Sequence, residues 1–249
     1  NLRCGSNYNK EVALLESFDI DSSFLYDPIM NDMRTKNSKK YKYNLFFKTM
    51  DKAYLFISNH RDIIMDSALL NFIMLENEMN ATQIAIGDNL LTKPWVSDLM
   101  RLNRSFIVKR SASAKREKLA NSKELSAYIQ HTLKQTGDHI WIAQREGRAK
   151  NGIDETDTAV LKMLGLAGRM DKEDFSTSLQ ALNPIPVSLS YEFDPCDLLK
   201  ARELAAKALG EEYQKSENED VVSIVTGLMG KKGRVQVTFG QQIDDAAFA

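Results

Sequence analysis

The sequence predicts an α/β fold with a mostly parallel central sheet flanked by helices. Short apolar runs recur along the chain, and most of them are followed by a segment with the apolar spacing of a helix. Strands that alternate with helices favour parallel pairing, because each helix returns the chain to the side of the sheet where the next strand begins. The carboxyl ends of such strands are the expected place for a ligand site.

Six segments have the composition of strands. In chain order they are AYLFIS (53–58), QIAIG (83–87), SFIVKR (105–110), HIWIAQ (139–144), PIPVSLSYE (184–192) and GRVQVTFG (233–240). Helical spacing covers 62–77, 94–102, 114–135, 155–167 and 197–209, with Pro94 as a favoured first residue and Gly137 and Gly210 as stops. Residues 221–229, VVSIVTGLM, fit either a helix or a strand, because β-branched side chains conflict with helical spacing.

Residues 1–50 do not follow this alternation. EVALLESF (11–18) has helical spacing, and RTKNSKKYKYNLFFK (34–48) is basic and aromatic without one acidic residue. We therefore expect two parts: an N-terminal helical or irregular cap over 1–50, and an α/β domain over 51–249. Clustered lysines with aromatic side chains are typical of a contact with an anionic membrane surface, although a solvated basic loop has the same composition.

Composition excludes several classes of protein. The 249 residues carry a net charge of −1, which gives no general attraction for nucleic acid. Cys4 and Cys196 stand far apart and form neither a disulfide framework nor a metal pattern, so we expect a reducing compartment and no metal. No apolar run approaches the roughly 18 residues that span a bilayer.

The stretch SNHRDIIMD (58–66) places a histidine and two aspartates between a predicted strand and a predicted helix. A kinase catalytic loop would need a glycine-rich loop before it and a DFG after it, and neither occurs. A zinc site would need further ligands at a suitable spacing, which His131 and His139 do not supply. The stretch fits a general base, His60, oriented by a carboxylate, Asp62 or Asp66. A plain helix start capped by Asp62 is the structural alternative.

Three later stretches complete a pattern. They are RLNRSFIVKR (101–110), AQREGRAKNG (143–152) and NPIPVSLSYE (183–192). With NHRDIIMD they arrive in the order and rough spacing of the four sequence blocks of the glycerolipid acyltransferase family, and IAIGDNLL (84–91) is similar to the segment between the first two blocks. The chain thus resembles the bacterial glycerol-3-phosphate and 1-acylglycerol-3-phosphate O-acyltransferases over roughly residues 52–192.

The resemblance implies a role for particular residues. His60 becomes the catalytic base, and its acid partner is Asp66, one place later than in the family pattern, or else Asp62. The resemblance also implies a set of substrate-binding residues, with the basic ones placed at the phosphate of the acceptor: Lys109, Arg110, Glu146, Gly147, Arg148 and Pro186.

The implied reaction moves a fatty acyl group from an acyl-thioester to a hydroxyl of glycerol-3-phosphate or 1-acylglycerol-3-phosphate, in phospholipid biosynthesis. The implied donor is acyl-coenzyme A or acyl carrier protein, with no bound cofactor, and a second basic stretch over 101–118 suits an acidic carrier protein or coenzyme A phosphates. The expected location is cytoplasmic and peripheral on the inner face of the membrane. Two alternatives stay open: an O-acyltransferase for another lyso-lipid, and a non-catalytic module that binds lipid or acyl carrier protein.

Overall fold

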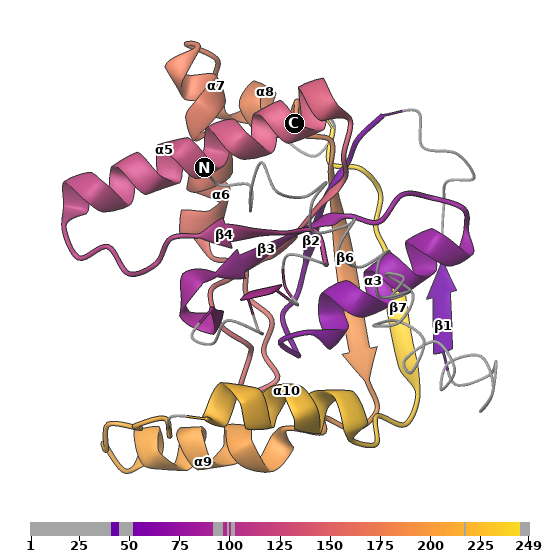
Figure 1. Cartoon of the computed structure of the whole chain (residues 1–249), viewed down its shortest axis with the longest axis vertical. Helices are drawn as coiled ribbons and strands as arrows, with labels where there is room; N and C mark the ends of the chain where they lie inside the picture. The colour runs from indigo at the N-terminus through magenta and orange to yellow at the C-terminus, as the bar shows by residue number, and fades with distance from the viewer. Residues whose placement is uncertain are drawn as a thin grey trace.

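A seven-stranded sheet forms the centre of the computed structural model, which describes residues 41–44, 52–91, 97–98, 100, 103–216 and 218–244. The strands lie in the order β1-β7-β6-β2-β5-β3-β4 (Figure 1). All neighbours pair in parallel except β6 and β7. Their bounds are β1 Tyr41–Asn44, β2 Leu55–Ser58, β3 Gln83–Gly87, β4 Ser105–Val108, β5 Ile140–Ala143, β6 Pro184–Tyr191 and β7 Val235–Phe239. The predicted α/β class with a mostly parallel sheet is confirmed.

Helices cover both faces of the sheet. Figure 1 shows α5 to α8 on one side, α3 on the other, and α9 and α10 side by side at one end of the molecule. A 3₁₀ turn, Asp88–Leu90, follows β3, and a π turn, Thr132–Thr136, extends α5. The helices are α3 Met65–Glu76, α5 Lys115–His131, α6 Thr158–Leu164, α7 Leu166–Met170, α8 Phe175–Gln180, α9 Asp197–Ala208 and α10 Glu219–Met229.

Two hydrophobic cores result, one on each face of the sheet. Strand β2 serves both, because successive side chains of a strand point to opposite faces. Phe56 packs with Leu69 of α3 in one core, while Leu55 packs with Ile129 of α5 in the other. All four residues of β2 are buried, which explains why this strand reads as a continuous apolar run rather than an alternating one.

The N-terminal segment departs from expectation where the structure describes it. Residues 1–40 and 45–51, with the expected helix over 11–18, lie outside the described residues. An irregular or helical conformation is wrong for residues 41–44, which form β1 at the edge of the sheet. Strand β1 pairs in parallel with the edge of β7 that faces away from β6. The Asn44 side chain also accepts a hydrogen bond from Phe239 N at 3.0 Å. The expected boundary at residue 50 would therefore assign β1 to a different part of the protein from the sheet with which it pairs.

Helices α10 and α8 add to what the sequence predicted. Residues 221–229, which fit either element, are helical in α10. Helix α8 was not expected, although Asp174 is a cap signal: its side chain accepts a hydrogen bond from Thr177 N at 2.9 Å. Within the expected helix over 94–102, the described residues 97, 98 and 100 are helical.

Candidate active site

The turn after β2 carries His60 at the carboxyl end of the parallel strands. Asn59 ties this turn to β6, since its Nδ2 donates to Leu189 O at 2.9 Å and its Oδ1 accepts from Leu189 N at 2.8 Å. On the other side, Ala149 N donates to His60 O at 2.9 Å, and the Trp141 ring meets the imidazole edge to face at 6.3 Å. The turn is therefore held by both strands that flank β2, while the His60 side chain keeps 16% of its surface exposed.

The imidazole of His60 pairs with the carboxylate of Asp66. The His60 Nδ1 and Asp66 Oδ2 atoms are 3.0 Å apart, and Asp66 has no exposed surface. The same oxygen accepts the backbone N–H groups of Arg61 at 2.7 Å and Asp62 at 3.0 Å, so the turn folds around the carboxylate. An ionised carboxylate only accepts hydrogen bonds, so Nδ1 carries the hydrogen and Nε2 keeps a lone pair.

Asp62 has a different place. Its Oδ1 accepts from Ile64 N at 3.0 Å and Met65 N at 2.9 Å, at the start of α3. Burial and then the charge of Asp66 raise the pKa of Asp62, against the effect of these N–H groups and of Arg148. Of the two aspartates offered as partners, the structure brings Asp66 to the ring and sets Asp62 under the first turn of the helix.

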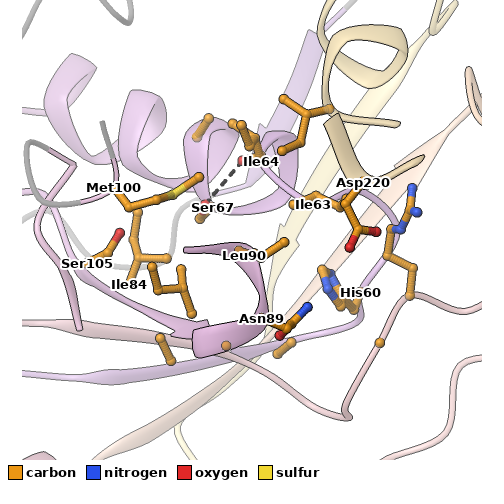
Figure 2. Close-up of a pocket in the computed structure, with 18 of the residues that line it drawn as sticks. His60, Ile63, Ile64, Ser67, Ile84, Asn89, Leu90, Met100, Ser105 and Asp220 are labelled. Carbon is orange, nitrogen blue, oxygen red and sulfur yellow. Dashed lines mark hydrogen bonds between the residues drawn. The ribbon is translucent and has the colours of Figure 1, made fainter. Parts of the chain in front are cut away.

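A pocket of about 560 Å³ opens beside His60 (Figure 2). Its size lies in the range of small-molecule sites, ~300–1,000 Å³. One wall is formed by Ile63, Ile64, Ile84, Ile86, Leu90 and Met100. Helix α10 supplies another wall, with Val221, Ile224, Val225 and Leu228. The imidazole of His60 thus lines a pocket whose walls are largely apolar.

Arg110 reaches the pocket from the loop after β4. Asp88 fixes this loop, accepting from Arg110 N at 3.2 Å and from the Ser111 hydroxyl at 3.0 Å. Desolvation opposes the ionisation of Asp88, but the hydrogen bonds from Ser111 and Arg110 outweigh it and lower the pKa. The Arg110 Nη1 atom lies 3.5 Å from Glu146 Oε1, and Glu146 also lines the pocket. The Glu146 side chain is 69% exposed, so this ion pair is open to solvent and to ligands.

Gly147 and Arg148 complete the polar end of the pocket. Gly147 has a φ of 73°, a conformation that favours glycine, and it turns the chain inward after β5. Arg148 is 7% exposed, and its Nη2 donates to Ser223 Oγ of α10 at 3.2 Å. Its Nη1 is buried and has no hydrogen-bond partner among the described residues. A buried guanidinium with a free donor beside a pocket suits an anionic ligand.

Two of the residues offered for substrate binding do not line the pocket. Lys109 directs its Nζ to Glu124 Oε2 of α5 at 2.9 Å. Successive side chains in extended backbone point to opposite sides, so Arg110 faces the pocket and Lys109 faces away. Pro186 lies within β6, where its carbonyl accepts from Gly240 N at 2.8 Å. The structure thus gathers His60, Arg110, Glu146, Gly147 and Arg148 at one pocket, with Asp66 behind the ring.

Sequence reasoning missed three contributors to this site. Tyr191, within the fourth block, donates its hydroxyl to Asp66 Oδ1 at 3.0 Å. Ser223 holds Arg148, and Asp220 lies in the pocket near His60 (Figure 2) while it pairs with Lys215 at 2.9 Å. Asp220 and Ser223 belong to α10, and no spacing in the sequence relates that helix to residues 60 or 148.

Within the described part of the chain, no group of three or more His, Cys, Asp or Glu side chains is arranged to hold a metal ion. No helix in that part has the length and apolar character needed to cross a bilayer.

Comparison with known proteins gives three findings. Residues 34–152 match the model of a family described as Acyltransferase. The chain is 25% identical over 194 residues to the glycerol-3-phosphate acyltransferases of Pseudomonas fluorescens strains SBW25 and Pf0-1. That alignment covers 78% of this chain but 21% and 22% of those two proteins, so the chain spans about a fifth of their length.

A solved structure also matches: the 1-acyl-sn-glycerophosphate acyltransferase PlsC from Thermotoga maritima. The TM-score is 0.42 at 10% identity, and the match covers 85% of this chain and 64% of that one.

Proposed function

We propose that this chain, whose residues 34–152 match the Acyltransferase family, is a glycerolipid acyltransferase that moves a fatty acyl group from an acyl-thioester to a hydroxyl of glycerol-3-phosphate or 1-acylglycerol-3-phosphate. One observation carries this proposal. A His60–Asp66 pair stands at the wall of an apolar pocket that also receives the buried guanidinium of Arg148. A base, an apolar compartment and a cation are the three elements that an acyl transfer to a phosphate-bearing acceptor requires.

His60 acts as the general base in this reaction. Its Nε2 takes the proton of the acceptor hydroxyl while the oxygen attacks the thioester carbonyl carbon. The C–S bond then breaks, and the proton on Nε2 passes to the departing thiolate, so His60 ends the cycle neutral. Asp66 holds the ring through Nδ1 and stabilises the imidazolium that forms between these two steps.

Arg148 and Arg110 bind the phosphate of the acceptor. Arg148 contributes the buried Nη1 donors that have no partner among the described residues. Arg110 contributes a second guanidinium. When the acceptor binds, its phosphate takes the place of the exposed Glu146 carboxylate as the partner of Arg110. The acyl chain then lies against the apolar walls from α3, β3 and α10.

The acyl donor is acyl-coenzyme A or acyl carrier protein, and the protein works as a peripheral enzyme at a membrane surface. The outer side of α10 supports a lipid environment, because Val222 and Met229, which do not line the pocket, are 49% and 79% exposed. The basic and aromatic segment over 34–48, the other candidate for this contact, lies almost wholly outside the described residues.

A second acceptor class has its own observation. Asp220 and Glu146 place two carboxylates in the same pocket, and a carboxylate suits a neutral hydroxyl or a cationic head group better than a phosphate. A lyso-lipid without a phosphate, such as a lyso-aminolipid, is therefore the alternative acceptor.

A panel of acceptors tests the proposal. The full chain is incubated with labelled acyl-coenzyme A or acyl carrier protein and with glycerol-3-phosphate, 1-acylglycerol-3-phosphate or a phosphate-free lyso-lipid, and the labelled product is quantified. Turnover that requires a phosphate supports the main proposal, and turnover without one supports the alternative. If every acceptor fails with both donors while the protein still binds lipid or acyl carrier protein, the chain is a binding module and the proposed reaction is wrong.

A further inference from the structure

The carboxylate of Asp66 is held from two sides. Its Oδ2 receives the imidazole and two backbone N–H groups, whereas its Oδ1 receives the hydroxyl of Tyr191 at 3.0 Å. Tyr191 is the last residue of β6 and lies 125 positions later in the chain. One carboxylate therefore connects the His60 ring to a phenol on a neighbouring strand.

Strand β6 holds the turn around His60 at two points. Asn59, directly before His60, exchanges two hydrogen bonds with the backbone of Leu189. Two residues further along the same strand, Tyr191 reaches Asp66, and its ring packs against the core on the α3 side of the sheet. Two contacts on one strand fix both ends of the turn, so the direction of the phenol hydroxyl is determined by the sheet.

We propose that Tyr191 is a positioning residue for the base: its hydroxyl shares the charge of Asp66 and so sets how readily His60 takes up a proton. The inference deepens the proposed acyl transfer and rests on it. A donor on Oδ1 draws negative charge away from Oδ2, which weakens the attraction between the carboxylate and the imidazolium. With Tyr191 in place, His60 remains neutral, and thus competent as a base, down to a lower pH.

The protonated phenol is the form that the site maintains. Burial, and after it the charges of Asp66 and Asp62, raise the pKa of Tyr191 well above its usual value. Other charged groups lie near the pair or line the same pocket: Asp62 on the turn, Asp194 after β6, Arg148, Glu146 and Lys150 after β5, Arg110 after β4, Lys215 before α10 and Asp220 on α10. None of these is a donor to Asp66 Oδ1 that the structure records, so removal of the Tyr191 hydroxyl takes away the hydrogen bond recorded at that oxygen.

The test is a titration of His60 that does not depend on turnover. The chain contains three histidines, so the imidazole signals of the labelled full-length protein can be followed by NMR, with His60→Ala to assign the signal of His60. In Tyr191→Phe we expect the midpoint of His60 to move upward by about 0.5 pH unit, a fraction of the effect of a neighbouring charge. Tyr128→Phe is the matched control: it removes a hydroxyl that donates to Gln83 at 2.5 Å, and it should leave the midpoint in place.

A double substitution separates a role through Asp66 from a general disturbance. In an Asp66→Asn background, adding Tyr191→Phe should leave the His60 midpoint unchanged. An unchanged or lowered midpoint in Tyr191→Phe alone would overturn the inference, and so would an equal shift in the Asp66→Asn background. If Tyr191→Phe does not fold, Tyr191→Leu removes the same hydroxyl and is read in the same way.

Kinetics distinguish failure of this inference from failure of the proposed function. In an active parent protein, the acid limb of kcat/KM should move upward in Tyr191→Phe with the NMR midpoint, while KM for the donor stays constant. A parent protein without turnover refutes the proposed reaction and leaves the NMR result to decide on Tyr191. An active parent with the same acid limb in both proteins refutes the role of Tyr191 and leaves the reaction standing.

Discussion

Arg148 Nη2 and Ser223 Oγ are 3.2 Å apart, and this hydrogen bond joins the loop after β5 to helix α10. On the same helix Gly227 lies directly against the Asp62 carboxylate, and Ser223 O accepts a hydrogen bond from Cys196 Sγ at 3.4 Å. Helix α10 is thus seated on the residues around the base, and its apolar side becomes a wall of the pocket. The shape of the pocket depends on how closely this helix approaches the turn after β2.

Gly227→Ala should destabilise the protein. A Cβ atom at this position would overlap the buried carboxylate of Asp62, so either the helix or the cap of α3 must shift. We expect the free energy of unfolding in urea to fall by about 1–3 kcal/mol, as for an overpacked core. Val222→Ala, at an exposed position of the same helix, is the control and should change it by less than about 0.5 kcal/mol. Equal stability of Gly227→Ala and the parent would mean that α10 is not packed on Asp62.

Arg148→Ala should weaken acceptor binding selectively. The variant removes the buried donor that we place at the phosphate, so KM for a phosphate-bearing acceptor should rise roughly 10- to 100-fold, as for a lost hydrogen bond to a charged group. KM for the donor should change less than about twofold. Lys109→Ala is the matched control, because this cation pairs with Glu124 outside the pocket. Unchanged acceptor kinetics in Arg148→Ala would remove this residue from the phosphate site.

Substitution of Asp66 should mainly affect turnover, whereas substitution of Asp62 should mainly affect stability. Asp66→Asn leaves the ring without an ionised partner, so kcat should fall by roughly 10²- to 10⁴-fold with little change in either KM. Asp62→Ala removes hydrogen bonds to Ile64 N and Met65 N, so its main effect should be a loss of about 0.5–2 kcal/mol in the free energy of unfolding. Steady-state kinetics and urea unfolding on both variants check this. The reverse pattern would make Asp62 the partner of His60.

Stability should fall between pH 6.5 and 4 because of His139. Burial, assisted by Arg104 and opposed by Asp138, lowers the pKa of His139 from 6.5 to about 4. The folded protein therefore binds fewer protons than the unfolded chain in this window. The contribution is complete above pH 6.5 and is lost as the pH falls, by about 3 kcal/mol at pH 4.

Urea unfolding at several pH values measures this effect. His139→Gln should reduce the dependence, since glutamine can still accept the hydrogen bond that Tyr54 N donates to the ring. His131→Gln is the control at an exposed position and should keep the full dependence. An identical slope in the parent and in His139→Gln would show that other groups cause the loss.

Much of the fold could be predicted because its signals are local. The six expected strands appear as β2 to β7, and the helices that follow β2, β4 and β6 begin within three residues of their expected starts. A strand that is buried on both faces, as β2 is, can be recognised from its apolar composition alone. The edge strand β1 was missed because its pairing depends on β7, nearly 200 residues later in the chain.

The residues of the site likewise fall into those that the sequence predicted and those that it did not. The resemblance placed His60, Arg110 and Arg148 together, because these residues follow β2, β4 and β5, parallel strands whose carboxyl ends lie along one edge of the sheet. The contributions of α10 and Tyr191 were not predicted, since they arise from packing between distant segments. The sequence of α10 was ambiguous for a related reason: Gly227 and Ser223 are buried against the turn after β2 and the loop after β5, and this packing favours a helix over what its valines prefer.

The most direct measurement compares acyl transfer by the parent protein and by His60→Ala, with an acyl-thioester donor and a phosphate-bearing acceptor at saturating concentrations. Circular dichroism and thermal unfolding establish that both proteins are folded. If the imidazole is the base, the parent turns over and kcat in His60→Ala is lower by roughly 10²-fold or more. Equal turnover by the two folded proteins would contradict the account.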